Sequence, residues 1–303
     1  MNALAQPATH AGNQAAPADD GTAAEPALPG HKPALEHADA RRAAWLDALS
    51  AAVLKAIPPL AGFALFLLVW QGIAAMIPAI PTPAATWQAA VPLFSDPFYR
   101  NGPNDQGIGW NVLASLARVG AGFGLAALIG IPAGFALGRF AFLNAMMAPI
   151  ISLLRPVSPL AWLPIGLLLF KSANPAAIWA IFICSIWPMV INTAVGVTRV
   201  PQDYLNVARV LDLSEWKVFT RVLLPAVLPY MLTGVRLSIG TAWLVIVAAE
   251  MLTGGTGIGF WLWDEWNNLK VEHIVIAIFI IGVVGLLLEY ALLTLARRFS
   301  YGN

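Results

Sequence analysis

Among the polar side chains inside or at the edges of long apolar stretches, where polar groups are costly and often functional, five are candidate functional residues. They are Arg118, Arg155, Asn192, Arg236 and Glu250. An arginine at the centre of a membrane costs about 2.5–3.5 kcal/mol on insertion scales, so each should face a partner or a water-filled cavity. One interpretation is an electropositive route for an anion. The other is structural: the arginines satisfy carbonyls of broken helices, pair with Glu250, or extend from a span end to the interface.

A second polar group lies in NVARVLDLSEWKVFTRVLLP, residues 206–225, which is charged and amphipathic between two apolar stretches. Asp212 and Glu215 have the spacing of a capping box, with Asp212 as the N-cap. Leu211 and Trp216 have the spacing of a hydrophobic staple. The pattern predicts two short helices at an angle, which favours a presented binding surface over a solvated loop.

The composition indicates a membrane protein. Of 303 residues, 59% are hydrophobic and 11% charged, and the mean hydropathy is +0.72, whereas about a quarter of a soluble chain is charged. The net charge of +1 argues against nucleic-acid binding. The single cysteine, Cys184, argues against a disulfide framework or a cysteine metal site. All four histidines lie outside or at the edge of the apolar stretches, so an intramembrane enzyme or metal centre is not expected.

Six apolar stretches are long enough to cross a hydrocarbon layer of about 30 Å. They cover roughly residues 58–77, 112–137, 146–170, 175–197, 222–252 and 273–296. The third contains LLRPVSPLAWLP and should be kinked or broken, since its prolines interrupt a helix. The fifth is too long for a perpendicular crossing and should tilt or project into the cytoplasm. We therefore expect an all-α polytopic fold with about six transmembrane helices.

The distribution of Lys and Arg predicts the orientation. They concentrate in the N-terminal segment, at Arg139, in the loop at 198–221 and at the C-terminus. By the positive-inside rule, both termini and this loop are cytoplasmic. The outer side then holds residues 78–111 and 253–272. The second outer loop is glycine-rich and lacks the Lys-Ser/Thr of a phosphate loop, so we expect a flexible turn at Gly254, Gly255, Gly257 and Gly259.

The spacing within residues 206–225 resembles the cytoplasmic signature of permease subunits of type I ABC importers: E-A-A, three residues, Gly, nine residues, I-x-L-P. Asn206-Val207-Ala208 matches E-A-A, Asp212 matches the glycine, and Val222-Leu223-Leu224-Pro225 matches I-x-L-P. Asn206, Val207 and Asp212 depart from the pattern. The resemblance extends from about residue 58 to the C-terminus. SLARVGAGF (115–123), LLRPVSPLAWLPIGLLLF (153–170) and GVRLSIGTAWLVIVAAEML (234–252) look like the branch that handles nitrate, bicarbonate, sulfonates and taurine.

Two outer-loop stretches look most like permeases of nitrate/nitrite importers: FSDPFYRNGPNDQGIGWN (94–111) and VAAEMLTGGTGIGFWLWDEWNN (247–268). The resemblance implies a multi-pass subunit of the bacterial inner membrane that pairs with a second copy of itself. It also implies cytoplasmic ABC ATPase subunits, which hold ATP and Mg, and a periplasmic or lipoprotein anion-binding protein. The permease itself would bind no cofactor and catalyse no reaction. Nitrate and nitrite are the expected cargo, with cyanate, bicarbonate and sulfonates or taurine as alternatives.

Three segments are expected within this frame. Residues 1–37 should be a disordered Ala/Pro-rich cytoplasmic tail, and residues 38–57 an amphipathic helix beside the membrane. Residues 58–303 should form the permease domain, with coupling helices at about 201–221. The residues assigned to ATPase coupling are Asn206, Ala208, Arg209, Asp212, Ser214, Glu215, Trp216, Phe219 and Pro225. A secondary anion transporter is the remote alternative, although we see none of the repeated halves that such proteins usually show.

Overall fold

The computed structural model describes residues 33–102 and 105–299, so most of the predicted tail at 1–37 lies outside the described residues. The chain forms two units, Met1–Leu65 and Phe66–Asn303, and the second holds every candidate functional residue. The helices are α1 (Pro33–Met76), α2 (Pro83–Ser95), α3 (Ile108–Arg139), α4 (Ala141–Leu154), α5 (Pro159–Phe170), α6 (Ala173–Thr198), α7 (Gln202–Val210), α8 (Glu215–Val218), the π-helix η1 (Phe219–Leu223), α9 (Leu224–Thr253), α10 (Ile258–Asn267) and α11 (Val271–Phe299).

The expected all-helical fold with about six spans is confirmed. Five described helical segments are long and apolar enough to cross a membrane: Val53–Met76, Ile108–Arg139, Ala173–Thr198, Glu215–Thr253 and Val271–Thr294. A sixth arises if α4 and α5, which are bent by 99° to each other, count as one broken span. The boundary expected at residue 57 falls inside α1, which continues through Pro58 and Pro59.

The break in the third expected span lies where the sequence places its prolines. Arg155, at the end of α4, still has helical backbone, with φ −56° and ψ −43°. Pro156 and Pro159 lack the N–H that a continuing helix would need, and a proline disfavours helical backbone at the residue before it. Ser158 accordingly has φ −56° and ψ 135° before α5 begins at Pro159. The predicted kink is therefore a change of direction between two helices.

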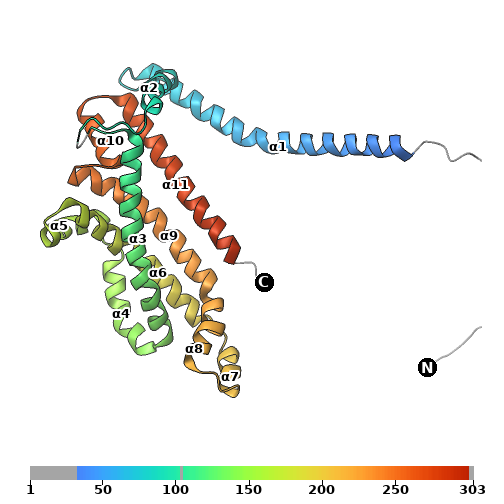
Figure 1. Ribbon diagram of the computed structural model, residues 1–303, viewed down its shortest axis with the longest axis vertical. Helices are drawn as coiled ribbons and strands as arrows, with labels where there is room; N and C mark the ends of the chain where they lie inside the picture. Colours follow the sequence, from blue (N-terminus) through green and yellow to red (C-terminus); the bar gives the residue numbers. More distant parts are fainter. Residues whose placement is uncertain (1–32, 103–104, 300–303) are drawn as a thin grey trace, which may run out of the picture. The chain divides into compact units, whose positions relative to one another are not determined.

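Small residues allow α3 and α6 to pack closely. A Cβ added to Gly122, Gly134 or Gly138 of α3 would lie 2.5–2.7 Å from a Cβ atom of α6. Spacings of four residues between small side chains bring helix backbones together in membranes, where dispersion contacts drive packing. Figure 1 shows α3, α6 and α9 running side by side, with α7 and α8 at one end and α10 at the other. This bundle connects the two ends that carry the candidate sites.

Candidate functional site

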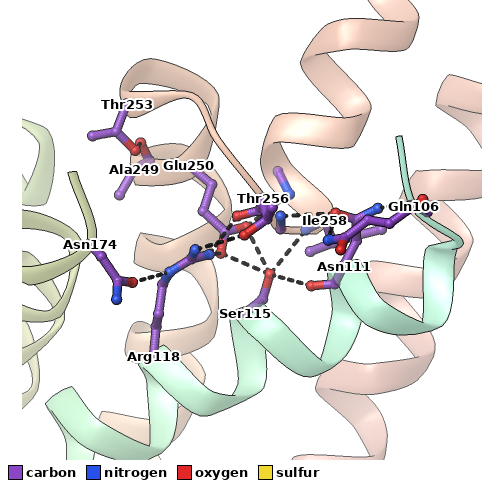
Figure 2. A network of polar contacts seen from close by, with 12 residues as sticks. Gln106, Asn111, Ser115, Arg118, Asn174, Ala249, Glu250, Thr253, Thr256 and Ile258 are labelled. Carbon is purple, nitrogen blue, oxygen red and sulfur yellow. Dashed lines mark hydrogen bonds and ion pairs between the residues drawn. The ribbon is translucent and has the colours of Figure 1, made fainter. Parts of the chain in front are cut away.

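A buried polar network lies at the α10 end of the bundle and is centred on Glu250 (Figure 2). Glu250 is near the end of α9 and is 1% exposed. Its Oε1 accepts from Arg118 Nη1 at 2.6 Å, and its Oε2 accepts from the backbone N–H of Gly259 at 3.0 Å. The hydroxyl of Ser115 lies 2.8 Å from both oxygens. The carboxylate is therefore held by a guanidinium, a hydroxyl and an amide at the first turn of α10, where the helix dipole favours negative charge.

All three donor nitrogens of Arg118 are engaged by protein oxygens. Nη1 also donates to the carbonyl of Thr256 at 2.6 Å, and Nη2 donates to the Thr256 hydroxyl at 3.2 Å. Nε donates to Asn174 Oδ1 at the start of α6. The charge of Arg118 is compensated by Glu250, and four hydrogen bonds engage four of its five N–H donors. The pairing of these two residues, one of the structural alternatives raised above, is confirmed.

The glycine-rich turn between α9 and α10 is bound to the network instead of being a free loop. Gly257 N–H donates to Asn111 Oδ1 and Ile258 N–H donates to Ser115 Oγ, each at 3.0 Å. Gly257 has φ 134°, and a Cβ there would lie 2.3 Å from the carboxyl carbon of Glu250. The expected turn is present, but the expectation of flexibility overlooked these bonds. The turn packs directly against the Glu250 carboxylate, which leaves no room for a Cβ at Gly257, and its positive φ also favours glycine.

Sequence reasoning missed Asn111, Ser115 and Thr256 as members of this network. Asn111, Ser115 and Arg118 are spaced i, i+4 and i+7, which places them on one face of α3. That spacing was the available signal, because three polar residues on one face of an apolar helix indicate a common buried partner. Thr256 gave no such signal, since its role depends on the turn around Glu250.

The other residues predicted to line a translocation path lie elsewhere. Arg155 follows α4 at the break, is exposed, and borders a cavity of about 630 Å³ between α3, α4 and α6. Arg236 of α9 forms an ion pair with Glu289 of α11. Asn192 donates from Nδ2 to the carbonyl of Pro188 in its own helix at 2.8 Å. The structure does not bring these residues together with Arg118, and their role in a path stays a prediction.

The 201–225 loop is anchored to the opposite end of the bundle by an apolar cluster. Buried members of this cluster are Val197, Val200, Ala208, Val218, Leu223 and Val227. Phe219 packs edge-on against Phe135 of α3, with ring centroids 5.0 Å apart. Arg139, at the end of α3, lies 3.9 Å from the carboxylate of Glu215. Contacts from α3, α6 and α9 therefore fix the base of this loop.

The capping predicted for this loop was wrong by two residues. Asp212 is not the N-cap of α8; Ser214 occupies that position, and its side chain makes no capping hydrogen bond. Asp212 instead has φ 49° and follows the end of α7. Leu213 N–H donates to the carbonyl of Ala208, and Asp212 N–H to that of Arg209, each at 3.0 Å. This is a Schellman motif with Asp212 at the left-handed C′ position, where glycine is usual.

The two-helix geometry also differs from the prediction. α7 is a separate helix, whereas α8 continues through η1 into α9, so that one helical segment covers Glu215–Thr253. The staple predicted between Leu211 and Trp216 is absent, since these side chains are 63% and 71% exposed. Leu213 and Val218, which hold the staple positions relative to Ser214, belong to the anchoring cluster instead.

The outer surface of the 201–225 loop is apolar as well as charged. Large exposed apolar side chains, each more than half exposed, are Tyr204, Val207, Val210, Leu211 and Trp216. Of the residues assigned to coupling, Ala208 is buried and Phe219 is half-buried, with its ring stacked on Trp216. The remaining seven are exposed: Asn206, Arg209, Asp212, Ser214, Glu215, Trp216 and Pro225. An anchored helix pair with an exposed apolar face is suited to docking a partner.

A charged cluster joins α10 to the start of α11. Glu265 Oε2 lies 3.0 Å from His273 Nδ1 and 3.5 Å from Lys270 Nζ. Burial alone would raise the pKa of Glu265, but His273 and then Lys270 more than offset this effect, so the pKa is lowered. The imidazole of His273 also stacks on Trp261, with ring centroids 5.9 Å apart. These contacts hold the end of the second outer loop that leads into α11.

The chain is similar in sequence and in fold to known transport proteins. Residues 126–301 match the family described as "Binding-protein-dependent transport system inner membrane component". The chain is 47% identical to the nitrate import permease protein NrtB of Synechocystis, covering 78% of this chain and 86% of that protein. It is 44% identical to the bicarbonate transport system permease protein CmpB of Synechocystis, covering 82% and 90%. A chain of the inward-facing MetNI methionine ABC transporter matches with a TM-score of 0.54 and 17% identity, covering 64% of this chain and 96% of that chain. At that identity the structural likeness shows the fold.

Proposed function

Because this chain belongs to the family of binding-protein-dependent transport system inner membrane components, we propose that it carries nitrate and nitrite through the inner membrane in an ATP-driven importer. Its place as an ABC importer permease of the inner membrane follows from the family and from its relatives. The proposal adds the cargo and the coupling of transport to ATP hydrolysis. The permease moves the anion without changing it chemically.

Nitrate is supported by the 47% identity to a nitrate import permease over most of both chains. The two outer-loop stretches that resemble nitrate/nitrite importers, residues 94–111 and 247–268, support the same cargo. Bicarbonate is the second candidate, since the bicarbonate permease is 44% identical. Nitrate and bicarbonate are both planar oxoanions with a single negative charge, so shape and charge alone do not separate the two candidates, and competition in a transport assay is needed.

The exposed apolar face of the 201–225 loop is the observation that carries the coupling proposal. Val210 is 86% exposed and Trp216 is 71% exposed, although both lie on a loop whose base is fixed by α3, α6 and α9. Large apolar side chains displayed on an anchored support indicate a protein interface. We assign this face to a cytoplasmic ABC ATPase that holds ATP and Mg.

The continuous helical segment Glu215–Thr253 provides a route for motion. At one end it carries Trp216, and near the other it carries Glu250 within the outer network. The π-helix η1 lies at the base of this segment, where such turns often mark functional sites. A displacement of the docked ATPase would therefore act directly on α9. The complete importer would contain a second copy of this permease, two ATPases and an anion-binding protein on the outer side.

Replacing Trp216 with Ala tests the docking surface. We expect the purified Trp216→Ala variant to keep its thermal stability and lose copurification with the ATPase and transport-stimulated ATP hydrolysis. Trp263→Ala is the matched control, because Trp263 is 41% exposed and lies on α10 at the opposite end. Unchanged ATPase capture and unchanged stimulated hydrolysis in Trp216→Ala would contradict the assignment.

A further inference from the structure

A pocket beside the outer network is not used by the function proposed above. It has a volume of about 540 Å³ and is bordered by Arg100, Gly102, Gln106, Trp110, Leu113, Ala114 and Thr256. We call it the Arg100 pocket. It belongs to the same end of the bundle as α10, because Gln106 and Thr256 are also part of the network around Glu250. On the predicted orientation, this end faces the side from which an imported anion arrives.

Of the described residues that border this pocket, Arg100 is the one with a charged side chain. Among the described residues, no carboxylate lies within ion-pair distance of its guanidinium, and no hydrogen-bond acceptor engages it. Asp105 is close in sequence but interacts with Tyr99: burial first, and then a hydrogen bond to Asp105, raise the pKa of that tyrosine. Arg100 thus forms no ion pair with a described residue, unlike Arg118.

Trp110 holds the guanidinium in place. The guanidinium carbon of Arg100 lies 4.7 Å from the centroid of the Trp110 ring, within the range of a cation–π contact. Trp110 is itself fixed, because its Nε1 donates to the carbonyl of Phe98 at 2.8 Å and the Phe98 ring packs edge-on against it. A ligand that binds here would immobilise less side-chain freedom than at a free surface arginine.

The backbone around the pocket is equally constrained. Arg100 and Gln106 form an antiparallel bridge, and Gly107 N–H donates to the carbonyl of Tyr99 at 2.8 Å. A Cβ at Gly107 would lie 2.2 Å from the carbonyl oxygen of Pro97. The described residues on either side of Arg100, 97–102 and 105–107, are therefore closely packed, and Arg100 has a defined position.

Thr256 supplies a second donor at the edge of the pocket. Its hydroxyl oxygen accepts from Arg118 Nη2 at 3.2 Å, which leaves the hydroxyl proton free to donate. Because Glu250 compensates Arg118, the pocket presents one net positive charge, a hydroxyl donor and an aromatic ring. That combination suits a small, weakly hydrated anion with a single charge, since a divalent anion would need more donors and more positive charge.

We propose that the Arg100 pocket is an outer site for a small planar oxoanion of the nitrate class, occupied before the anion enters the bundle. The relation to transport rests on the proposed function, whereas occupancy of the pocket by the anion does not. Arg100 supplies the charge and the charge-assisted hydrogen bonds, and Thr256 supplies a further donor. The Glu250 network keeps Thr256 in position.

The test measures binding without ATP or partner subunits. The full chain in lipid nanodiscs is titrated with ¹⁵N-labelled nitrate at constant ionic strength in chloride, and line broadening of the nitrate NMR signal reports binding. Loss of a charge-assisted hydrogen bond corresponds to roughly a tenfold or greater change. We therefore expect Arg100→Gln to weaken nitrate binding about tenfold or more, Arg100→Lys to weaken it less, and excess unlabelled nitrate to displace the label. Lys171→Gln, which removes an exposed positive charge outside this pocket, should bind as the unaltered chain does.

Three results would overturn the proposal: no saturable broadening with the unaltered chain, equal broadening with Arg100→Gln, or equal displacement by chloride. A loss of anion-binding-protein capture in Arg100→Gln with nitrate broadening unchanged would identify a protein dock and also refute an anion site. Failure of the proposed function is distinguishable, because nitrate could bind here as described while the reconstituted importer fails to transport it.

Discussion

The buried ion pair between Arg118 and Glu250 gives a prediction whose size follows from the structure. The side chains are 15% and 2% exposed, and the two atoms of the pair lie 2.6 Å apart. Removing one partner of a buried pair costs about 3–5 kcal/mol, because the remaining charge is left uncompensated. We expect Glu250→Gln to lower the free energy of unfolding by about 3 kcal/mol, since Gln keeps the shape of the side chain and one acceptor. Arg118→Gln should have an effect of similar size.

A double-mutant cycle separates this interaction from other effects of the two substitutions. We expect the double variant to be less destabilised than the sum of the single variants, with a coupling energy of about 2 kcal/mol or more. Arg139 and Glu215 provide a matched Arg–Glu control at the other end of α3. They lie 3.9 Å apart with side chains 43% and 90% exposed. An exposed pair of this kind should couple by less than about 1 kcal/mol.

Denaturant unfolding of the purified chain in detergent, followed by tryptophan fluorescence, measures both cycles. A coupling energy below about 1 kcal/mol for Arg118 and Glu250, or equal values for the two pairs, would refute the reasoning. It would mean that the network around the glycine turn does not depend on charge compensation. Arg118 would then not be held by Glu250 and would be available to a passing anion.

Three further predictions concern turns and pH. Gly257→Ala should destabilise the chain by more than Gly255→Ala in thermal unfolding. A Cβ at Gly255, at φ 97°, would have open space and cause only backbone strain of about 1–3 kcal/mol, whereas a Cβ at Gly257 would meet the buried carboxylate of Glu250. Equal losses would contradict the close packing of Gly257 against this carboxylate. Asp212→Gly should raise the free energy of unfolding by up to about 1 kcal/mol, and with it the unfolding midpoint, because glycine adopts the left-handed backbone at φ 49° without strain. A lower midpoint would show that the aspartate side chain stabilises the turn. Because the pKa of Glu265 is lowered in the folded state, its contribution to stability should be full above its unfolded pKa and be lost as the pH falls through the folded pKa. Glu265→Gln should therefore remove this loss of unfolding free energy at acidic pH. An unchanged pH profile would exclude the pair with His273.

The spans and the family were predictable because their signals are local. Apolar length defines a span wherever it occurs, and the prolines at 156 and 159 define the break between α4 and α5. The spacing of residues 206–225 identified the family, although Asn206 and Asp212 depart from its pattern. The resemblance is confirmed by the family match over residues 126–301.

The partners of the intramembrane charges could not be predicted in the same way. Arg118 and Glu250 are 132 positions apart, so their contact depends on how α3 and α9 pack. The caps of the 201–225 loop failed for a different reason. Asp212 and Ser214 are both good N-cap residues, and the choice between them depends on how many residues the end of α7 needs to close its turn. That number was set by the hydrogen bonds of Asp212 and Leu213 back to α7.

ATP-driven uptake of labelled nitrate into vesicles holding the reconstituted importer tests the central claim most directly. The vesicles would contain this permease and its ATPases, with the anion-binding protein on the outer side. We predict that nitrate accumulates only with hydrolysable ATP, that nitrite competes, and that bicarbonate and taurine compete weakly. No nitrate accumulation, with ATP-dependent accumulation of bicarbonate in the same vesicles, would contradict the proposed cargo.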